Sequence, residues 1–339
     1  MKTKNLKNTV KAISKVVGKN SVLPIIDNVL VVNDTLTVTD LNIFLSIKLP
    51  DNTLNGTYTL PFKEFKDMVG TFEDLSVTGV RDDHKVSLIG DGAQISIQGY
   101  NWEEYPKQPT IEVDRVGVLA QRDIDNMQEA LKYVSKDKLR PAMMQVAITK
   151  KHIVSTDAHK LFFEPTHIYG EHKFQPEVVE IMAIFGGNWE MARNETRIAV
   201  TNGDVTIQFL EEENKYPDVF AVIPTENNIA VQVSADELKN TIKQSLKFAN
   251  EISHQIVLSA NGILEVSAED VDWGKDYRKK ISKGYVKSGD DITIGFNGKY
   301  LLEILNNSDA KLTSITMSTP NRAAIINDNV LLMPVSINE

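Results

Sequence analysis

Asp157 and His159 are the residues of this sequence best suited to acid–base chemistry, because they place a carboxylate beside an imidazole. On a strand, side chains two residues apart share one face. The sequence has no Gly-x-Ser-x-Gly nucleophile turn, no phosphate-binding loop and no metal-spaced cluster to accompany them. We therefore expect no catalytic residues and predict a structural or binding role for His159. His167 and His172 lie in a polar stretch and are expected to be solvated.

The composition of the chain excludes several classes of protein. The 339 residues include no cysteine and six histidines, so we expect no disulfide, no metal site and no cofactor. No apolar run approaches the ~18 residues of a membrane span, and the first residues lack the apolar core of a secretory signal. We therefore expect a cytoplasmic protein without membrane contact. The net charge of -9 argues against a protein that coats nucleic acid with its whole surface.

An internal repeat is the most informative feature of the chain. The hexapeptide LKNTVK at residues 6–11 returns as LKNTIK at residues 238–243, and both are predicted to open an amphipathic helix. A third relative lies between them, where Ala130, Leu131, Pro141 and the pair Thr156-Asp157 mirror an earlier series about 117 residues upstream. That earlier series consists of Ala12, Ile13, Pro24 and the pair Thr39-Asp40.

Each repeat also contains a second, shorter helix, predicted at PFKEFKDMV, PEVVEIMAIF and FNGKYLLEIL. Alternating strand-like segments separate the helices, and Asn-Gly pairs at 202–203 and 261–262 predict hairpins. Tyr-Pro pairs at 105–106 and 216–217 recur where a unit would end. The sequence therefore predicts an α+β fold of three repeated domains, 1–114, 115–227 and 228–339, each with two helices packed on antiparallel sheets.

Lysines are concentrated on the first helix of each repeat, although the chain as a whole is acidic. They recur every four residues in the first and last repeats and gather at the end of the helix in the middle repeat. One such stripe is an ordinary solvated helix face, whereas three at equivalent positions favour a surface that faces a polyanion. The residues predicted to face this polyanion are Lys7, Lys11, Lys15, Lys136, Arg140, Lys239, Lys243 and Lys247.

Over nearly its whole length the chain resembles the bacterial β sliding clamps, the DNA polymerase III β subunit family. The first domain carries LPIIDNVLV and TVTDLNIFL, and the middle domain carries RPAMMQV and STDAHKLFF, which is similar to the family's Thr-Asp-Gly-His-Arg-Leu signature. The last domain carries IGFNGKYLLEIL and the terminal strand LLMPVSI. Each motif alone is weak, but their order and spacing are specific.

The resemblance implies a DNA clamp fold and a head-to-tail homodimer that closes a ring around duplex DNA without reading its sequence. It also implies that the polyanion is this DNA, and that Lys19 faces it together with the lysine stripes. It implies partners that carry linear clamp-binding motifs: the replicative polymerase, the clamp loader and repair proteins. It also implies a hydrophobic peptide-binding cleft between the middle and last domains. The cleft residues would be Met143, Thr156, His159, Lys160, Leu161, Pro217, Val222, Asn297, Tyr300, Leu331, Leu332, Met333, Pro334 and Val335.

Alternatives remain open at this point. Leu161 and Leu331, taken alone, would be ordinary core residues. Ala158 replaces the family's usual glycine, and Ala221 stands where many relatives have arginine, so the peptide preference can differ. A clamp-like protein that binds the same peptides without encircling DNA, as a decoy or regulator, fits the same sequence.

Overall fold

The computed structural model describes residues 2–18, 23–50, 54–81, 83–110, 114–281 and 285–337. Its contacts divide the chain into two compact units. Unit 1 comprises Met1–Gln128, Ile148–Lys151 and Thr166–Glu213, and unit 2 comprises Glu129–Ala147, His152–Pro165 and Asn214–Glu339. The middle predicted domain, 115–227, therefore contributes residues to both units.

Unit 1 is built on an eight-stranded sheet of order β4-β1-β2-β3-β15-β14-β13-β8 and a three-stranded sheet β5-β6-β7. The strands of these two sheets are β1 (Asn28–Val32), β2 (Thr35–Thr39), β3 (Ile43–Lys48), β4 (Thr57–Pro61), β5 (Leu75–Val80), β6 (Lys85–Gly90), β7 (Ala93–Gln98), β8 (Asp114–Leu119), β13 (Trp189–Arg193), β14 (Arg197–Thr201) and β15 (Val205–Leu210). Strand β12 (His172–Phe174) also lies in unit 1 but belongs to neither sheet.

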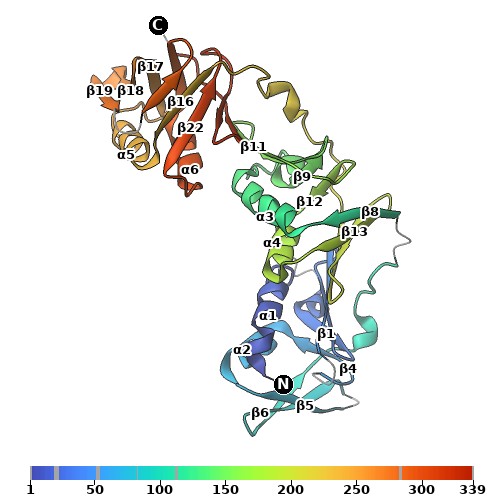
Figure 1. Ribbon diagram of the computed structural model, residues 1–339. Coiled ribbons are helices and arrows are strands. Elements are labelled where there is room, and N and C mark those ends of the chain that lie inside the picture. The colour runs from blue at the N-terminus through green and yellow to red at the C-terminus, as the bar shows by residue number, and fades with distance from the viewer. Residues whose placement is uncertain are drawn as a thin grey trace. The chain divides into compact units, whose positions relative to one another are not determined.

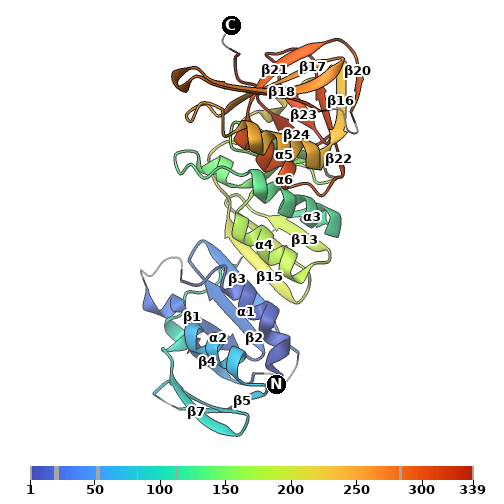
Figure 2. The same ribbon diagram turned by 90° about the vertical axis from the view of Figure 1, so that its left-hand side faces the viewer.

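The α-helices of unit 1 are α1 (Lys7–Ile13), α2 (Phe62–Thr71), α4 (Pro176–Phe185) and most of α3 (Gln121–Ala130), and its 3₁₀ helices are η1 (Thr3–Leu6), η2 (Pro24–Asp27) and η3 (Trp102–Glu104). Helix α1 packs against α2 and α4 (Figure 2). The apolar face of α2 explains its packing, because Phe62, Phe65, Met68 and Val69 recur at helical spacing and are buried.

Unit 2 contains a sheet in which the strands follow the order β10-β11-β24-β23-β22-β16-β20, and a four-stranded sheet β19-β18-β17-β21. Figure 1 labels β11, β16 and β22 of the first sheet and β17, β18 and β19 of the second. Its strands are β10 (His152–Thr156), β11 (Lys160–Pro165), β16 (Ile229–Ser234), β17 (Gln255–Asn261), β18 (Ile263–Asp270), β19 (Lys275–Ile281), β20 (Val286–Ser288), β21 (Ile292–Asn297), β22 (Leu312–Met317), β23 (Ala324–Ile326) and β24 (Val330–Leu332). Strand β9 (Val146–Thr149) has residues in both units.

The helices of unit 2 are α5 (Ala235–Ser245), α6 (Gly298–Asn306), η4 (Leu131–Tyr133), η5 (Pro141–Met144), η6 (Val219–Val222) and η7 (Val271–Trp273). Helices α5 and α6 pack together (Figure 2). Their buried faces include Leu238 and Ile242 from α5, and Leu301, Ile304 and Leu305 from α6. The six predicted α-helices and both Asn-Gly hairpins, β14–β15 and β17–β18, are confirmed among the described residues.

Two of the sequence predictions about these elements are wrong. LKNTIK does not open its helix, because α5 begins three residues earlier at Ala235. There the Ser234 side chain caps the helix by accepting a hydrogen bond from the backbone N–H of Glu237. The negative charges of Asp236 and Glu237 also interact favourably with the positive N-terminal end of the helix dipole. The other error concerns His172, which is buried in β12 and not solvated, with its Nε2 2.8 Å from the backbone oxygen of Tyr169.

Candidate functional site

A cleft of about 310 Å³ lies in unit 2, where four separate segments of the chain meet. The segments are η5, the turn between β10 and β11, the stretch around η6, and β24 with the residue that follows it. Among the residues predicted for the cleft, the structure brings together Met143, Thr156, His159, Lys160, Leu161, Pro217, Val222, Leu331 and Met333.

The turn that forms one wall is held by short-range hydrogen bonds. The Thr156 hydroxyl accepts from the N–H of Ala158 at 3.0 Å. The Asp157 carboxylate accepts from the N–H groups of His159 and Lys160 at 2.9 and 2.8 Å. These bonds hold Ala158 at a φ of 78°, a left-handed conformation that costs a residue with a Cβ about 1–2 kcal/mol.

The floor of the cleft is continuous with a hydrophobic core. Leu161 and Leu331 face each other on β11 and β24 and are only 2% and 1% exposed. They pack in one cluster with Val219 and Tyr216. The Tyr216 hydroxyl, which accepts from the backbone N–H of Thr156 at 3.1 Å, ties the η6 stretch to the turn. Leu161 and Leu331 are therefore core residues and cleft residues at once.

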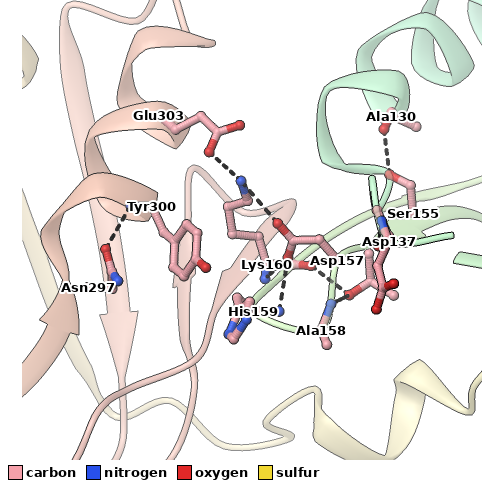
Figure 3. Close-up of polar contacts among 12 residues, drawn as sticks. Ala130, Asp137, Ser155, Asp157, Ala158, His159, Lys160, Asn297, Tyr300 and Glu303 are labelled. Atoms are coloured by element: carbon pink, nitrogen blue, oxygen red, sulfur yellow. Dashed lines mark hydrogen bonds and ion pairs between the residues drawn. The ribbon is translucent and has the colours of Figure 1, made fainter. Parts of the chain in front are cut away.

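Lys160 has an unusual environment, because its side chain is only 3% exposed. Its ammonium lies 2.5 Å from Glu303 and 3.2 Å from Asp157, and it sits 5.1 Å from the centre of the Tyr300 ring (Figure 3). The Tyr300 ring also stacks on His159 with centroids 4.8 Å apart. Two carboxylates and an aromatic face thus compensate the charge of a buried cation.

Five predicted cleft residues do not line the cleft. Tyr300 lies behind His159, and Asn297 caps α6 by accepting from the N–H groups of Lys299 and Tyr300. Leu332 is fully buried opposite Lys160. Val335 pairs with Gly295 in an isolated bridge, and Pro334 lies between Met333 and this bridge.

The cleft also contains residues that sequence reasoning did not assign to it. Arg140, which was predicted to face DNA, lines the cleft together with Ala158, Asp218 and Val219. Arg140 lies next to Pro141 of the Arg-Pro motif, and Asp218 and Val219 follow the Tyr-Pro pair. Their proximity to these motifs was the signal that could have found them.

The Asp157–His159 pair does not form a catalytic dyad in the described chain. The Asp157 carboxylate is engaged by backbone N–H groups and Lys160, whereas the imidazole stacks on Tyr300. The two residues flank a turn, not a strand, so the expectation that they share a strand face is wrong. Over the residues that the structure describes, no group of three or more potential metal ligands is found.

The lysines predicted to face DNA differ in their exposure and in whether their ammonium groups bond to other protein groups. Lys7, Lys11, Lys136, Lys243 and Lys247 are exposed. Lys15 forms an ion pair with Glu180 of α4 at 2.8 Å, and Lys239 donates to the backbone oxygen of Ser308 at 3.2 Å. Lys15 and Lys247 lie beyond the ends of their helices, and Lys19 lies outside the described residues.

The comparisons with known proteins agree with this architecture. Residues 1–109 match the family model of the DNA polymerase III beta subunit N-terminal domain, and residues 221–331 match that of its C-terminal domain. A beta sliding clamp of Chlamydia muridarum is 22% identical over 98% of this chain and 97% of its own length. One from Halalkalibacterium halodurans is 24% identical over 91% of this chain and 90% of its own length.

Solved structures of the same kind share the fold. The DNA polymerase III beta subunit of Thermotoga maritima gives a TM-score of 0.85 at 18% identity, covering 100% of this chain and 99% of that one. The sliding clamp of Pseudomonas aeruginosa bound to griselimycin gives a TM-score of 0.86 at 19% identity, covering 99% and 98%. The fold is thus that of the DNA sliding clamps.

Within that class, matching models at both ends and relatives that align over nearly the whole length identify the family. The chain belongs to the bacterial β sliding clamps, the DNA polymerase III β subunit family. The part of the chain that the structure describes contains no helix long and apolar enough to cross a membrane.

Proposed function

We propose that this protein is a non-enzymatic processivity clamp of DNA replication, which encircles duplex DNA as a head-to-tail homodimer in the cytoplasm. It tethers the replicative polymerase, the clamp loader and repair proteins through linear motifs that bind the cleft. The observation that carries the proposal is the cleft itself, because four segments of a chain from this family converge on an open, apolar site. We retain the three domains 1–114, 115–227 and 228–339 as part of the proposal.

The chemistry of the cleft suits an extended peptide with apolar anchors. Val222 and Met333 are 46% and 36% exposed at its mouth, and Leu161 and Leu331 form its floor. A flexible methionine at the mouth allows anchors of different shape to be accommodated, which suits a site shared by several partners. The turn supplies a rigid wall, and Lys160 adds little free charge because Glu303 and Asp157 neutralise it.

The proposed grip on DNA is weak and independent of sequence. Lys7, Lys11, Lys243 and Lys247 present exposed ammonium groups that can contact phosphates, and phosphate contacts carry no base specificity. A ring holds DNA by topology, so a few such contacts in an acidic protein are sufficient and permit sliding. The pairing of Lys15 with Glu180 and of Lys239 with Ser308 reduces the contribution of these two lysines.

Ring closure is tested by light scattering of the purified protein, combined with retention on nicked circular and linearised DNA at high salt after loading. The proposal expects a dimer that stays on circles and runs off linear ends. A monomer that is never retained topologically would instead establish the alternative, a peptide-binding decoy or regulator that does not encircle DNA.

The cleft is tested separately with Val222→Asp and Met333→Asp, which place a carboxylate at its exposed mouth. Each should weaken binding of a fluorescein-labelled peptide containing two leucines and a phenylalanine by at least tenfold. Val118→Asp is the matched control, because Val118 is 41% exposed on β8, outside the cleft. Equal affinity in the cleft variants and the control would remove the cleft from the proposal.

A further inference from the structure

The turn that walls the cleft has a structural copy in unit 1, at Thr39–Ile43 between β2 and β3. The Thr39 hydroxyl accepts from the N–H of Leu41 at 2.8 Å, as Thr156 does from Ala158 at 3.0 Å. The Asp40 carboxylate accepts from the N–H groups of Asn42 and Ile43 at 3.0 and 2.7 Å, matching Asp157. Leu41 has a φ of 76°, close to the 78° of Ala158.

The surroundings of the two turns correspond as well. Strand β15 lies beside β3 as β24 lies beside β11, so the N–H of Leu210 donates to Asn42 at 3.2 Å and that of Met333 donates to His159 at 3.0 Å. Tyr105 of the first Tyr-Pro pair is buried, as is Tyr216 of the second, but its hydroxyl donates to the backbone oxygen of Asn28 at 3.0 Å, whereas that of Tyr216 accepts from the N–H of Thr156. Unit 1 therefore contains the framework from which unit 2 builds its cleft.

The strand register identifies two positions at which the frameworks differ. At one of them Gln208 faces Phe44, where Leu331 faces Leu161 in unit 2; the other is at Arg197. In unit 1, Ile198 lies opposite Phe209, and Arg197 precedes it. In unit 2, Ala324 lies opposite Leu332, the counterpart of Phe209, so Ala323 is the counterpart of Arg197. A long cation in one unit thus corresponds to a side chain that ends at Cβ in the other.

Arg197 contacts the residues of unit 1 that correspond to cleft residues of unit 2. Its guanidinium donates to the backbone oxygens of Asn42 at 3.2 Å and Leu41 at 3.4 Å, and it lies 5.5 Å from the centre of the Phe44 ring. Leu41, Asn42 and Phe44 are the counterparts of Ala158, His159 and Leu161, which all line the cleft. Ala323 packs in the same cluster as Leu161 and Leu331, and its side chain has no donor group that could bond the carbonyls of the turn.

We propose that Arg197 is a plug that closes a second copy of the cleft in unit 1 and so limits the chain to one docking site for apolar linear peptides. The inference rests on the proposed function, because it takes the cleft of unit 2 to be the peptide site. Arginine suits the role, since its planar fork of N–H donors satisfies two carbonyls at once while its flat face covers an aromatic ring. Burial lowers the pKa of Arg197 but leaves its guanidinium charged.

The plug is tested in a background whose own cleft is blocked by Val222→Asp and Met333→Asp. Binding of the labelled Leu-Leu-Phe peptide is followed by fluorescence anisotropy, and its stoichiometry by calorimetry. The wild-type chain should bind one peptide and the blocked chain none. Adding Arg197→Ala should restore binding by at least tenfold over the blocked chain. The matched control is Arg193→Ala, on neighbouring strand β13, whose guanidinium lies 3.3 Å from Glu211, away from the turn.

The reciprocal change is Ala323→Arg in the otherwise unaltered protein, with Ala323→Ser as its control. The introduced guanidinium should reach the carbonyls of Ala158 and His159 and weaken peptide binding at least tenfold, whereas the serine variant should bind as wild type does. If burial of the new arginine prevents Ala323→Arg from folding, the proposal is tested by peptide binding to the Arg197→Ala variant alone.

The outcomes separate the plug from the proposed function. Two peptides per wild-type chain, or equal binding by the Arg197→Ala and Arg193→Ala forms of the blocked chain, would overturn the plug and leave the cleft of unit 2 intact. A wild-type chain that binds no peptide would remove the proposed cleft. A gain specific to Arg197→Ala would still support the plug in that case.

Discussion

Ala158→Gly should stabilise the protein, because the β10–β11 turn holds Ala158 at a φ of 78°. A left-handed conformation costs a residue with a Cβ about 1–2 kcal/mol. Glycine removes that cost but adds about 0.5–1 kcal/mol of conformational entropy to the unfolded chain. Ala158 is exposed, so little buried surface is lost with its methyl group. The net expectation is a stabilisation of about 0.5–1 kcal/mol, or a rise of about 1 °C in Tm for a chain of 339 residues.

Thermal unfolding followed by circular dichroism measures this effect, with two matched variants for comparison. Leu41→Gly relieves the same conformation at the corresponding turn of unit 1, but Leu41 is only 40% exposed, so the buried apolar surface it loses, worth about 1–2 kcal/mol, should cancel the gain and leave Tm unchanged or lower. Ala310→Gly alters an exposed alanine that is not among the residues with positive φ, so it should lower Tm. If Ala158→Gly lowers Tm as Ala310→Gly does, the reasoning from backbone strain is wrong.

Three further predictions concern the buried His172, the Tyr300 ring that lies against Lys160, and the lysine stripes. Burial lowers the pKa of His172, and its Nδ1 has no partner in the described structure, so stability should be present above about pH 6.5 and decline as the pH falls below it. His172→Gln should flatten that decline in urea unfolding at pH 5 and 8, whereas a change at exposed His167 should not. Tyr300→Ala should lower the free energy of unfolding by about 1–2 kcal/mol, because it removes the ring against His159 and Lys160, and Tyr300→Phe should not. If Tyr300→Ala and Tyr300→Phe have equal urea unfolding midpoints, the inference that the ring contacts stabilise the fold is wrong. Reversing Lys7, Lys11, Lys243 and Lys247 to Glu should weaken loading on DNA and flatten its salt dependence more than the same reversal at Lys48, Lys107, Lys215 and Lys280, which are exposed but lie outside the lysine stripes. Equal effects of the two sets would mean that net charge, and not a particular surface, governs loading.

The sequence by itself determined the repeat, the six α-helices and the family. These features depend on local patterns: apolar residues at helical spacing, Asn-Gly at hairpins, and motifs in a fixed order. The same locality explains where prediction failed. The start of α5 was misplaced because the repeated hexapeptide resembles a helix start, whereas the cap at Ser234 lies outside it. His172 was misjudged because its neighbours in the chain are polar, although its neighbours in space bury it.

Only the tertiary structure decided which candidate residues meet and which charges are free. The cleft brings together segments more than a hundred residues apart, so spacing along the chain could not separate Met333, which lines it, from Leu332, which is buried under Lys160. Lys15 and Lys7 look alike in the sequence, yet one meets Glu180 and the other is exposed. The contrast between Arg197 and Ala323 became visible only through strand register, because hydrogen bonding between strands, and not sequence position, establishes which residues correspond.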